Sequence, residues 1–307
     1  MSVKDKFGKV AVLCGGFSGE REVSLHSGQQ VHQGLVSAGV DAHLVDVGHD
    51  IVRKLEAEQF DRVFSVLHGR GGEDGTMQAL LEYLKLPYCS SGVAASALAM
   101  DKVRTKWIWQ ANQLPTPLFR LIKDEKDLEV VKAKLTLPIA VKPVHEGSSL
   151  GVIKVTDYAQ LKAAYLKAKE CNDHIMAEEW IEGDEYTVTI VGHTLYPSIK
   201  ISTPNHEFYD YEAKYTDHST VYECPSNLTG NDEFRLQRLS MRAFRLLGCR
   251  GWGRVDVMRA HDGTFFLIEV NTLPGMTETS LVPQAALAAG VSFPALVVKI
   301  LETSLTR

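Results

Sequence analysis

Hydrophobic and polar positions follow two rhythms along the first hundred residues. The short apolar runs "KVAVL", "DAHLVDV" and "RVFSVL" predict buried strands. Longer stretches with helical spacing, "LHSGQQVHQGLVSAG" and "TMQALLEYLKL", follow the first and the third of these runs. Strands that alternate with helices are typical of a parallel sheet. We therefore expect a small parallel α/β domain over residues 1–101.

The pattern changes near residue 101, where one helix-like stretch, "ALAMDKVRTKWIWQANQ", runs into the proline-bounded segment "LPTP". Beyond it, "PIAVKP", "GVIKV" and "HIMAEEWI" predict strands and "DYAQLKAAYLKAKE" predicts a helix. These elements predict an α+β unit over residues 102–184.

Residues 185–307 predict a third domain, also α+β. It contains the strands "EYTVTIV" and "YPSIKI", the helix "DEFRLQRLSMRAFRLLG", a hairpin and a helical tail. Between the strands and that helix lies the polar, tyrosine-rich stretch "NHEFYDYEAKYTDHSTVYECPSN", which predicts no regular structure. Segments of this length are usually active-site lids or disordered.

Composition narrows the class of protein. The 307 residues are 45% hydrophobic and 23% charged, as in an ordinary soluble globular protein. A net charge of -5 argues against a general nucleic-acid binder. No apolar run approaches a membrane span of about 18 residues, and the N-terminus does not resemble a signal peptide. The five cysteines lie far apart without metal-binding spacing, so we expect a cytoplasmic protein with reduced thiols.

The hairpin "RVDVMRAHDGTFFLIEVN", residues 254–271, holds two carboxylates inside apolar runs. A two-residue Asp-Gly turn would place Asp256 opposite Glu269 and Arg254 opposite Asn271, all on one face. Two carboxylates and an amide oxygen at this spacing suit Mg²⁺ or Mn²⁺. The alternatives are a surface pair neutralised by Arg254 or two carboxyls that share a proton. A one-residue bulge would undo the count.

Two glycine-rich loops could approach a ligand. In "VKPVHEGSSLGV", Lys142 ends a strand and Ser148 and Ser149 add hydroxyls, which together could hold a polyphosphate. Taken alone, this loop is better explained as a flexible hairpin turn, and it is not a Walker A loop. "CGGFSGE" follows the first strand as a dinucleotide-binding loop would, but the motif requires glycine at position 14, which is cysteine. A redox dinucleotide enzyme is therefore a weak alternative.

Polar residues also follow the carboxyl ends of two strands of the first domain. Glu20 comes after the first strand, and His68 and Glu73 come after "RVFSVL". In open α/β sheets this edge is where ligands bind. Each residue alone could be a helix cap or a solvated charge, so the prediction of a site depends on their grouping.

The segment "IMAEEWIEGDE" combines apolar and acidic positions. Trp180 and Ile181 could form an apolar wall for an adenine, with Glu178 and Glu185 placed to bind polar groups. A half-buried strand with an acidic outer face fits the same pattern.

Seven motifs together resemble the D-alanine–D-alanine ligase family of the ATP-grasp superfamily. They are "GGFSGEREVSLHSG", "LHGRGGEDGT", "MDKVRTK", "VKPVHEGSSLGV", "YDYEAKY", "GWGRVDVM" and "EVNTLPGMTETSLVP". They keep the family's order and cover nearly the whole chain. The resemblance implies a two-lobed ATP-grasp fold after the N-terminal domain. It also implies ATP-dependent ligation of two D-alanines through a D-alanyl phosphate, for peptidoglycan synthesis, by a cytoplasmic homodimer.

The resemblance implies a role for each matching residue. Two Mg²⁺ ions, which Mn²⁺ can replace, would be held by Asp256, Glu269 and Asn271. ATP would be bound by Lys102, Lys142, Ser149, Glu178, Trp180, Ile181, Glu185, Phe208 and Lys214. D-Alanine and its reaction would involve Glu20, His68, Ser148, Tyr215, Arg254, Gly275, Ser280 and Leu281.

The tyrosine at position 215 bears on the product. In the family it bonds through Ser148 toward Glu20 and so latches the lid to the glycine-rich loop and the first domain. Relatives that make the D-alanyl–D-lactate ester depart from tyrosine here, so the sequence favours the dipeptide. The remaining alternatives are a D-alanine–D-lactate or D-serine ligase, and a non-catalytic ATP-binding regulator on the same scaffold.

Overall fold

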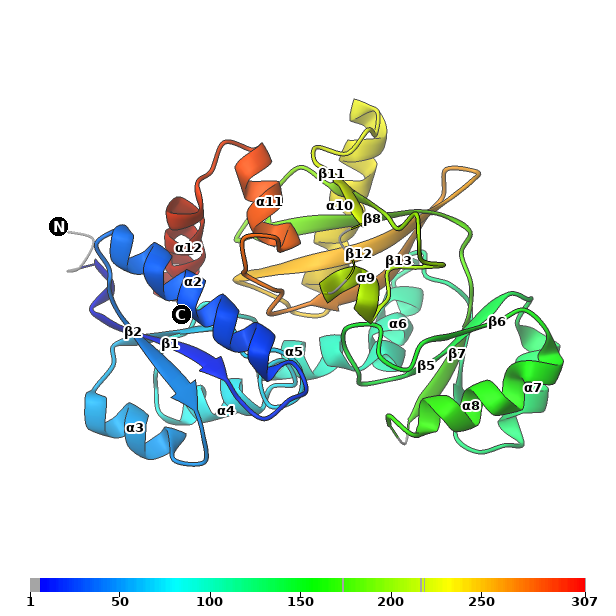
Figure 1. Cartoon of the computed structure of the whole chain (residues 1–307), viewed down its shortest axis with the longest axis horizontal. Coiled ribbons are helices and arrows are strands. Elements are labelled where there is room, and N and C mark those ends of the chain that lie inside the picture. The colour runs from blue at the N-terminus through cyan, green and yellow to red at the C-terminus, as the bar shows by residue number, and fades with distance from the viewer. Residues whose placement is uncertain (1–5, 173, 216, 218, 307) are drawn as a thin grey trace.

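The computed structural model describes residues 6–172, 174–215, 217 and 219–306, without the side chains of Tyr211 and Tyr215. Its strands form three separate sheets, each drawn from one continuous part of the chain. Figure 1 shows the three sheets around a common centre, with the first at the left, the second at the lower right and the third above.

The first sheet is parallel, as the sequence predicts, with strand order β2-β1-β3. Helices flank it, and one of them, α3, is not predicted by the pattern. The elements are β1 (Lys9–Gly15), α2 (Arg21–Ser37), β2 (Asp41–Val47), α3 (Ile51–Glu58), β3 (Arg62–Ser65) and α4 (Thr76–Tyr83). The carboxyl ends of β1 and β3 point toward the centre of the molecule, where the candidate site lies (Figure 1).

The helix expected across residue 101 is instead two helices, α5 (Val93–Met100) and α6 (Lys102–Ala111). Asp101 separates them in an extended conformation, and its side chain accepts a hydrogen bond from the backbone N–H of Arg104 at 2.8 Å. An aspartate that caps a new helix competes with continuation of the old one, which explains the break.

The second sheet is antiparallel, with order β4-β7-β5-β6. Two helices pack on it and bury an apolar core that includes Val131, Val141 and Leu161. The elements are β4 (Phe119–Ile122), α7 (Asp127–Lys134), β5 (Ile139–Pro143), β6 (Ile153–Val155), α8 (Leu161–Lys169) and β7 (Ile175–Glu179).

The third sheet is also antiparallel, and its central strands β8 and β12 are long and buried. Its order is β11-β10-β8-β12-β13, with β9 paired to β8. The strands are β8 (Gly183–Val191), β9 (Thr194–Leu195), β10 (Ile199–Ser202), β11 (Val221–Glu223), β12 (Trp252–Ala260) and β13 (Phe265–Asn271). Helix α10 (Gly230–Leu246) lies against this sheet.

The tyrosine-rich stretch is not structureless, contrary to the expectation. It contains the short helix α9 (Tyr211–Tyr215) and the edge strand β11. Strand β11 pairs with β10 and thereby fastens one end of the stretch to the third sheet. The segment is polar because it covers a cavity, so its sequence does not show the alternation of a half-buried strand.

The C-terminal helices α11 (Leu281–Ala288) and α12 (Phe293–Glu302) pack back toward the N-terminal domain. Gly34 of α2 leaves room for this contact, because a Cβ there would lie 3.1 Å from Val297. Among the described residues no single helix is long and apolar enough to cross a membrane. One pair, from residue 281 to 288 and from 293 to 306, passes that test only when joined across a bend of 105°. None of the five cysteines forms a disulfide, and three of them are buried.

Candidate active site

The hairpin of β12 and β13 has the predicted register at the residues that matter. Arg254 pairs with Asn271, and Asp256 pairs with Glu269. Their alternation along the strands gives the four side chains a common face. The predicted juxtaposition of the two carboxylates is therefore confirmed.

The chain reaches this register by a different path. The backbone N–H of Ala260 donates to the carbonyl of Thr264 at 2.9 Å, so the turn holds three residues, 261–263, rather than two. Gly263 takes a left-handed φ of 86°, as the last position of such a turn requires. A bulge at Ile268 then restores the pairing, because Val257 pairs with Leu267 while the next pair skips one residue. The two-residue turn was wrong, and the bulge compensates for it.

Asp256 is buried and fully engaged. Arg254 donates two hydrogen bonds of 2.8 Å to its two oxygens, the amide of Asn271 donates one of 2.9 Å, and Thr187 donates one of 2.7 Å. Burial would lower the pKa of Arg254, but the charge of Asp256 raises it well above its usual range. This is the pairing with Arg254 that the sequence left open, although the pair lies inside the site and not on an open surface.

Glu269 faces several cations. Lys102 lies 3.2 Å from its carboxylate. Burial would raise the pKa of Glu269, but the charges of Lys102, Lys214 and Lys142 outweigh it and hold the pKa far below its usual range. Glu269 is therefore an ionised ligand-type group at neutral pH.

A third carboxylate, Glu185 of β8, approaches the same face. Burial, opposed by Lys214 and reinforced by Asp256 and Glu269, raises the pKa of Glu185 to about 7. Burial is the main cause of this rise, and the nearby acids add to it; oxygen donors grouped in this way fit a hard divalent ion. Within the described chain no three His, Cys, Asp or Glu side chains form a metal-binding group, so the set depends on the amide of Asn271.

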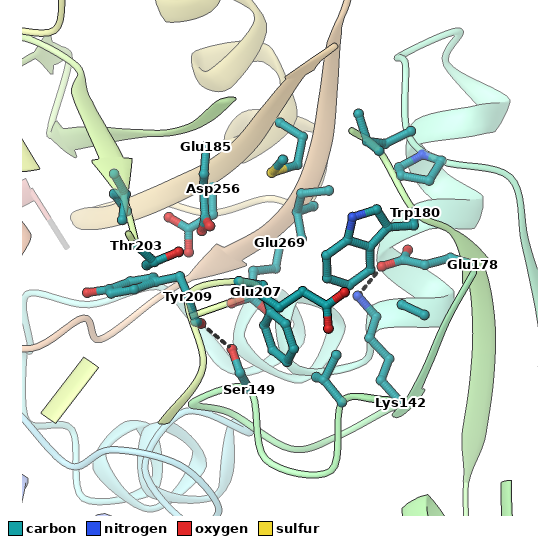
Figure 2. Close-up of a pocket in the computed structure, with 18 of the residues that line it drawn as sticks. Lys142, Ser149, Glu178, Trp180, Glu185, Thr203, Glu207, Tyr209, Asp256 and Glu269 are labelled. Carbon is teal, nitrogen blue, oxygen red and sulfur yellow. Dashed lines mark hydrogen bonds and ion pairs between the residues drawn. The ribbon is translucent and has the colours of Figure 1, made fainter. Parts of the chain in front are cut away.

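A cavity of about 500 Å³ opens beside the hairpin, walled by β5, β7, β8, β12 and β13 (Figure 2). Every residue that the resemblance assigns to ATP lines it: Lys102, Lys142, Ser149, Glu178, Trp180, Ile181, Glu185, Phe208 and Lys214. The metal-type carboxylates Asp256 and Glu269 line it as well.

Aromatic and charged side chains close the outer end of this nucleotide-sized cavity. The rings of Trp180 and Phe208 meet edge to face with their centres 5.5 Å apart. Lys154 of β6 lies 4.8 Å above the Trp180 ring and pairs with Glu207 of the tyrosine-rich stretch at 3.0 Å. Figure 2 shows Glu207 and Trp180 side by side at this end.

Glu178 of β7 is a buried carboxylate between two lysines. It forms ion pairs with Lys142 and, at 2.9 Å, with Lys106. Burial would raise the pKa of Glu178, but these two charges lower it to about 2. Lys106 was not among the predicted site residues. Its signal was its position four residues after Lys102, on the same face of helix α6.

The tyrosine-rich stretch contacts the glycine-rich loop between β5 and β6. Ser149 donates to the backbone carbonyl of Tyr209 and accepts from Lys214, each at 3.0 Å. Ser148 donates to the carboxylate of Glu20, so the loop also reaches the first domain. The predicted latch thus has its Ser148–Glu20 half in place, while the side chain of Tyr215 lies outside the described part of the chain.

A second cavity of about 420 Å³ lies where the first and third sheets meet. It is lined by the residues that the resemblance assigns to D-alanine: Glu20, His68, Ser148, Arg254, Gly275, Ser280 and Leu281. Three residues, Tyr209, Lys214 and Glu269, line both cavities. The two cavities therefore meet at the hairpin.

His68 is held in one orientation by hydrogen bonds. Its Nδ1 lies 2.9 Å from the carbonyl of Leu273, and its Nε2 lies 3.3 Å from Ser27. Burial, more than the opposing charge of Glu20, lowers the pKa of His68 below its ordinary value. A neutral ring that donates through Nδ1 and accepts through Nε2 satisfies both contacts. Ser27, which the sequence did not single out, also accepts from the backbone N–H of Met276.

Glu73 lies beside this network, and within the described part of the chain it has no cation as partner. It accepts backbone hydrogen bonds from Gly69 at 2.7 Å and Leu273 at 3.3 Å. Burial and the charge of nearby Glu20 raise the pKa of Glu73 to about 8. The acidic grouping predicted at the ends of β1 and β3 is therefore formed, with one acid neutral.

The loop before α11 supplies the remaining predicted residues. Ser280 precedes the helix, and its hydroxyl accepts from the backbone N–H of Thr277 at 3.0 Å. Gly275 lies against it, and a Cβ at position 275 would come within 2.8 Å of the Ser280 oxygen. A side chain is thereby excluded at position 275, which leaves its backbone open to the cavity.

Comparisons with known proteins point to one family. A family model described as "D-ala D-ala ligase C-terminus" matches residues 108–302, and one described as "D-ala D-ala ligase N-terminus" matches residues 49–91. The chain is 52% identical over 300 residues to the D-alanine–D-alanine ligase of Marinobacter nauticus, with 98% of this chain and 92% of that protein covered. It is 54% identical over 297 residues to that of Aromatoleum aromaticum, with 97% and 96% covered.

Solved structures show the same similarity. The D-alanine–D-alanine ligase from Bacillus anthracis complexed with ATP superposes with a TM-score of 0.85 at 31% identity, with 97% of each chain covered. The VanG D-Ala:D-Ser ligase from Enterococcus faecalis superposes with a TM-score of 0.85 at 29% identity, with 96% of this chain and 99% of that chain covered.

Proposed function

Because the chain belongs to the D-alanine–D-alanine ligase family, we propose that its two cavities divide one ATP-dependent ligation between them. The protein joins two D-alanines into D-alanyl-D-alanine, a precursor of peptidoglycan, with ATP as the energy source. One observation carries the assignment of the site. The two cavities share a wall of Tyr209, Lys214 and Glu269, so a nucleotide in one would direct its terminal phosphate at a substrate in the other.

In this proposal the nucleotide lies along the 500 Å³ cavity. Trp180, Ile181 and Phe208 enclose the adenine. Glu178 accepts a hydrogen bond from the amino group of the adenine, and Glu185 binds the ribose hydroxyls. The phosphates lie against the cationic end of the cavity, where Lys102, Lys142, Ser149 and Lys214 supply charge and hydrogen bonds. Phosphoryl transfer depends mostly on such positioning and charge neutralisation.

The residues Asp256, Glu269 and Asn271 would hold two Mg²⁺ ions, and Mn²⁺ could replace them. When bound, the ions neutralise phosphate charge and polarise the oxygens that they contact. Arg254 would then share Asp256 with the cations and turn part of its hydrogen-bonding capacity toward the substrate. The protein's own contribution is to keep Glu269 ionised and to hold the two carboxylates opposite each other on one face of the hairpin.

The first D-alanine binds in the 420 Å³ cavity. Glu20 holds its ammonium group, with Ser148 fixing the carboxylate of Glu20 and His68 lying beside the substrate. One oxygen of the substrate carboxylate attacks the terminal phosphorus of ATP, ADP leaves, and an acyl phosphate forms. The contacts between the lid and the glycine-rich loop keep water from this reactive group.

The second D-alanine binds with its carboxylate against Ser280 and the backbone of Leu281. Its amine, after losing a proton, attacks the acyl carbon and gives a tetrahedral intermediate that expels phosphate. Arg254 and the backbone N–H of Gly275 donate hydrogen bonds to the developing oxyanion. Donors fixed in advance at this position stabilise the transition state more than the substrate.

We also propose the coarser setting of the enzyme. Three domains would divide near residues 101 and 184, although α12 of the third packs on α2 of the first. From the family we infer a cytoplasmic location, which cell fractionation tests. We also infer a homodimer, which analytical ultracentrifugation tests. The ester-forming and D-serine-forming alternatives are not favoured, because the relatives at about half identity carry the dipeptide ligase name.

The test of the activity is a product assay with ATP, Mg²⁺ and D-alanine, alone or with equal D-lactate or D-serine. We expect the dipeptide to be the main product in every mixture at neutral pH. Tyr215→Phe should loosen the lid and raise the ratio of ester to dipeptide, measured by mass spectrometry. A dominant ester or mixed dipeptide from the unmodified protein would overturn the assignment, as would ATP hydrolysis without any dipeptide.

A further inference from the structure

Lys106 is a lysine with no exposed surface, and the mechanism above does not use it. Its ammonium group, on helix α6, lies 2.9 Å from a carboxylate oxygen of Glu178. It also donates to the hydroxyl of Thr116 at 2.7 Å and to the backbone carbonyl of Leu267 at 3.4 Å. Two hydrogen bonds and one ion pair therefore hold this buried ammonium group in place.

The contacts of Lys106 tie together three parts of the site. Glu178 belongs to β7 of the second sheet, and Thr116 lies in the connection between α6 and β4. Leu267 belongs to β13 of the third sheet, next to the bulge that sets the register of the metal-type carboxylates. Lys106 itself lies behind Glu178 and is not among the residues that line the nucleotide-sized cavity. It acts on that cavity only through its neighbours.

The two lysines around Glu178 therefore have different positions. Lys142 lines the cavity and can also reach a phosphate, whereas Lys106 is fixed in the protein interior. If Lys142 turns toward the nucleotide, Lys106 is the charge that stays on Glu178. A buried carboxylate without any such partner takes up a proton, because burial penalises its charged form.

We propose that Lys106 is a positioning residue that holds Glu178 as a fixed, ionised hydrogen-bond acceptor for the 6-amino group of a purine, and so sets the preference for ATP over GTP. The inference rests on the proposed binding of adenine beside Glu178, Trp180 and Ile181. Figure 2 shows Glu178 directed toward Lys142 beside the Trp180 ring.

The preference follows from hydrogen-bond chemistry. An ionised carboxylate only accepts hydrogen bonds, so it fits the amino group of adenine and opposes the carbonyl oxygen of guanine. A protonated carboxyl can donate, and it would accept guanine. A site built for one hydrogen-bond pattern discriminates strongly, because the wrong base leaves buried polar groups unpaired. The charge of Lys106 thus becomes a specificity determinant without any contact with the base.

The experiment compares Lys106→Met, Glu178→Gln and the surface control Lys162→Met, whose side chain is 61% exposed on α8. For Lys106→Met we expect KM for ATP to rise about tenfold or more, with kcat and KM for D-alanine within about twofold. The ratio of kcat/KM for ATP to that for GTP should fall by about tenfold or more. Lys162→Met should match the unmodified enzyme in all three quantities.

The variants separate the possible failures. If Glu178→Gln leaves both KM for ATP and the ATP/GTP ratio unchanged, the proposed adenine site itself is wrong. If Glu178→Gln changes them and Lys106→Met does not, the role of Lys106 is refuted. A fall in kcat and thermal stability with an unchanged ATP/GTP ratio would make Lys106 merely structural. Lys106→Gln, which keeps two N–H donors without the charge, replaces the methionine variant if that fails to fold and should give the same loss of base preference.

Discussion

The two cavities are similar in size, about 500 and 420 Å³, but their acidic groups are held in opposite ways. In the nucleotide cavity three carboxylates have cationic partners: Glu178 has two lysines, Asp256 has Arg254 and Glu269 has Lys102. In the substrate cavity Glu20 and Glu73 are held by hydroxyl and backbone N–H groups. The first cavity is prepared for a polyanion with its metal ions, and the second keeps negative charge for an ammonium group.

The difference between the cavities shows how glutamate can serve as an ionised group in one place and as a neutral group in another. Glu178 is buried and Glu73 is partly buried, yet the pKa of Glu178 falls to about 2 and that of Glu73 rises to about 8. Burial raises both, and only the neighbouring charges differ. The two lysines beside Glu178 keep it ionised, whereas Glu73, which lies near the carboxylate of Glu20, stays neutral at neutral pH.

The largest loss of activity should come from a substitution of Glu269, which lines both cavities. Glu269→Ala removes a proposed metal ligand and leaves Lys102 without its partner, so kcat should fall on the order of 10³-fold or more. The measurement is dipeptide formation at saturating substrates, with circular dichroism to show that the fold is kept. Near-native turnover would refute the hairpin as the metal site. Glu129→Ala, on the exposed surface of α7, is the control and should be fully active.

A substitution of Glu20 should affect the substrate cavity without affecting the nucleotide cavity. Glu20→Gln removes the charge offered to the first substrate's ammonium, so KM for D-alanine should rise roughly 100-fold. KM for ATP should stay within about threefold, because Glu20 lines only the substrate cavity. Initial rates over both substrates measure the two constants. An equal rise in both would show that the cavities are not distinct, and Glu56→Gln on α3 provides the background.

Glu73 sharpens the comparison through pH. Its pKa rises from 4.5 to about 8 on folding, so its stabilising contribution is fully present below pH 4.5 and is lost as the pH rises through 8. Glu73→Gln cannot ionise. Its melting temperature minus that of the unmodified protein should therefore grow by roughly 5 °C between pH 4.5 and 8. Parallel melting curves across this range would contradict a neutral Glu73.

The smallest expected effect concerns the outer end of the nucleotide cavity. Lys154→Met removes the ion pair with Glu207 and the contact with the Trp180 ring. Exposed pairs of this kind contribute little, so KM for ATP should rise by only about two- to threefold. Lys167→Met on α8 should show no change. A rise in KM for ATP of more than about tenfold would mean that this contact is essential for nucleotide binding and not a minor contribution.

Much of the fold could be predicted from the local pattern of hydrophobic and polar residues, and the exceptions have physical causes. Periodicity predicted the first, parallel sheet and several strands of the other two, but not the break at Asp101, where a single side chain caps a new helix. The hairpin register was right although its turn was wrong, because the left-handed Gly263 and the bulge at Ile268 shift the count in opposite senses. Strand β11 was missed because an edge strand that covers a polar cavity has no apolar face.

Site residues could be predicted where their position in the sequence is unusual. They could not be predicted where their role depends on burial in the folded protein. Glu20, Asp256 and Glu269 stand out because acids at strand ends and inside strands are unusual. Lys106 and Ser27 do not, because a lysine or a serine on a helix reads as an ordinary solvent-facing residue. Only the packing of α6 against β7 and β13, and of α2 beside His68, places these two side chains in the interior.

The most direct test is a crystal structure with ADP, Mn²⁺ and a phosphinate analogue of the tetrahedral intermediate. The prediction is anomalous density for Mn²⁺ about 2 Å from oxygens of Asp256, Glu269 and Asn271, with the phosphinate in reach of Arg254 and Gly275. The base should lie beside Glu178. Carboxylates of residues 256 and 269 that face opposite sides of the sheet, or Mn²⁺ and nucleotide bound elsewhere, would contradict the account.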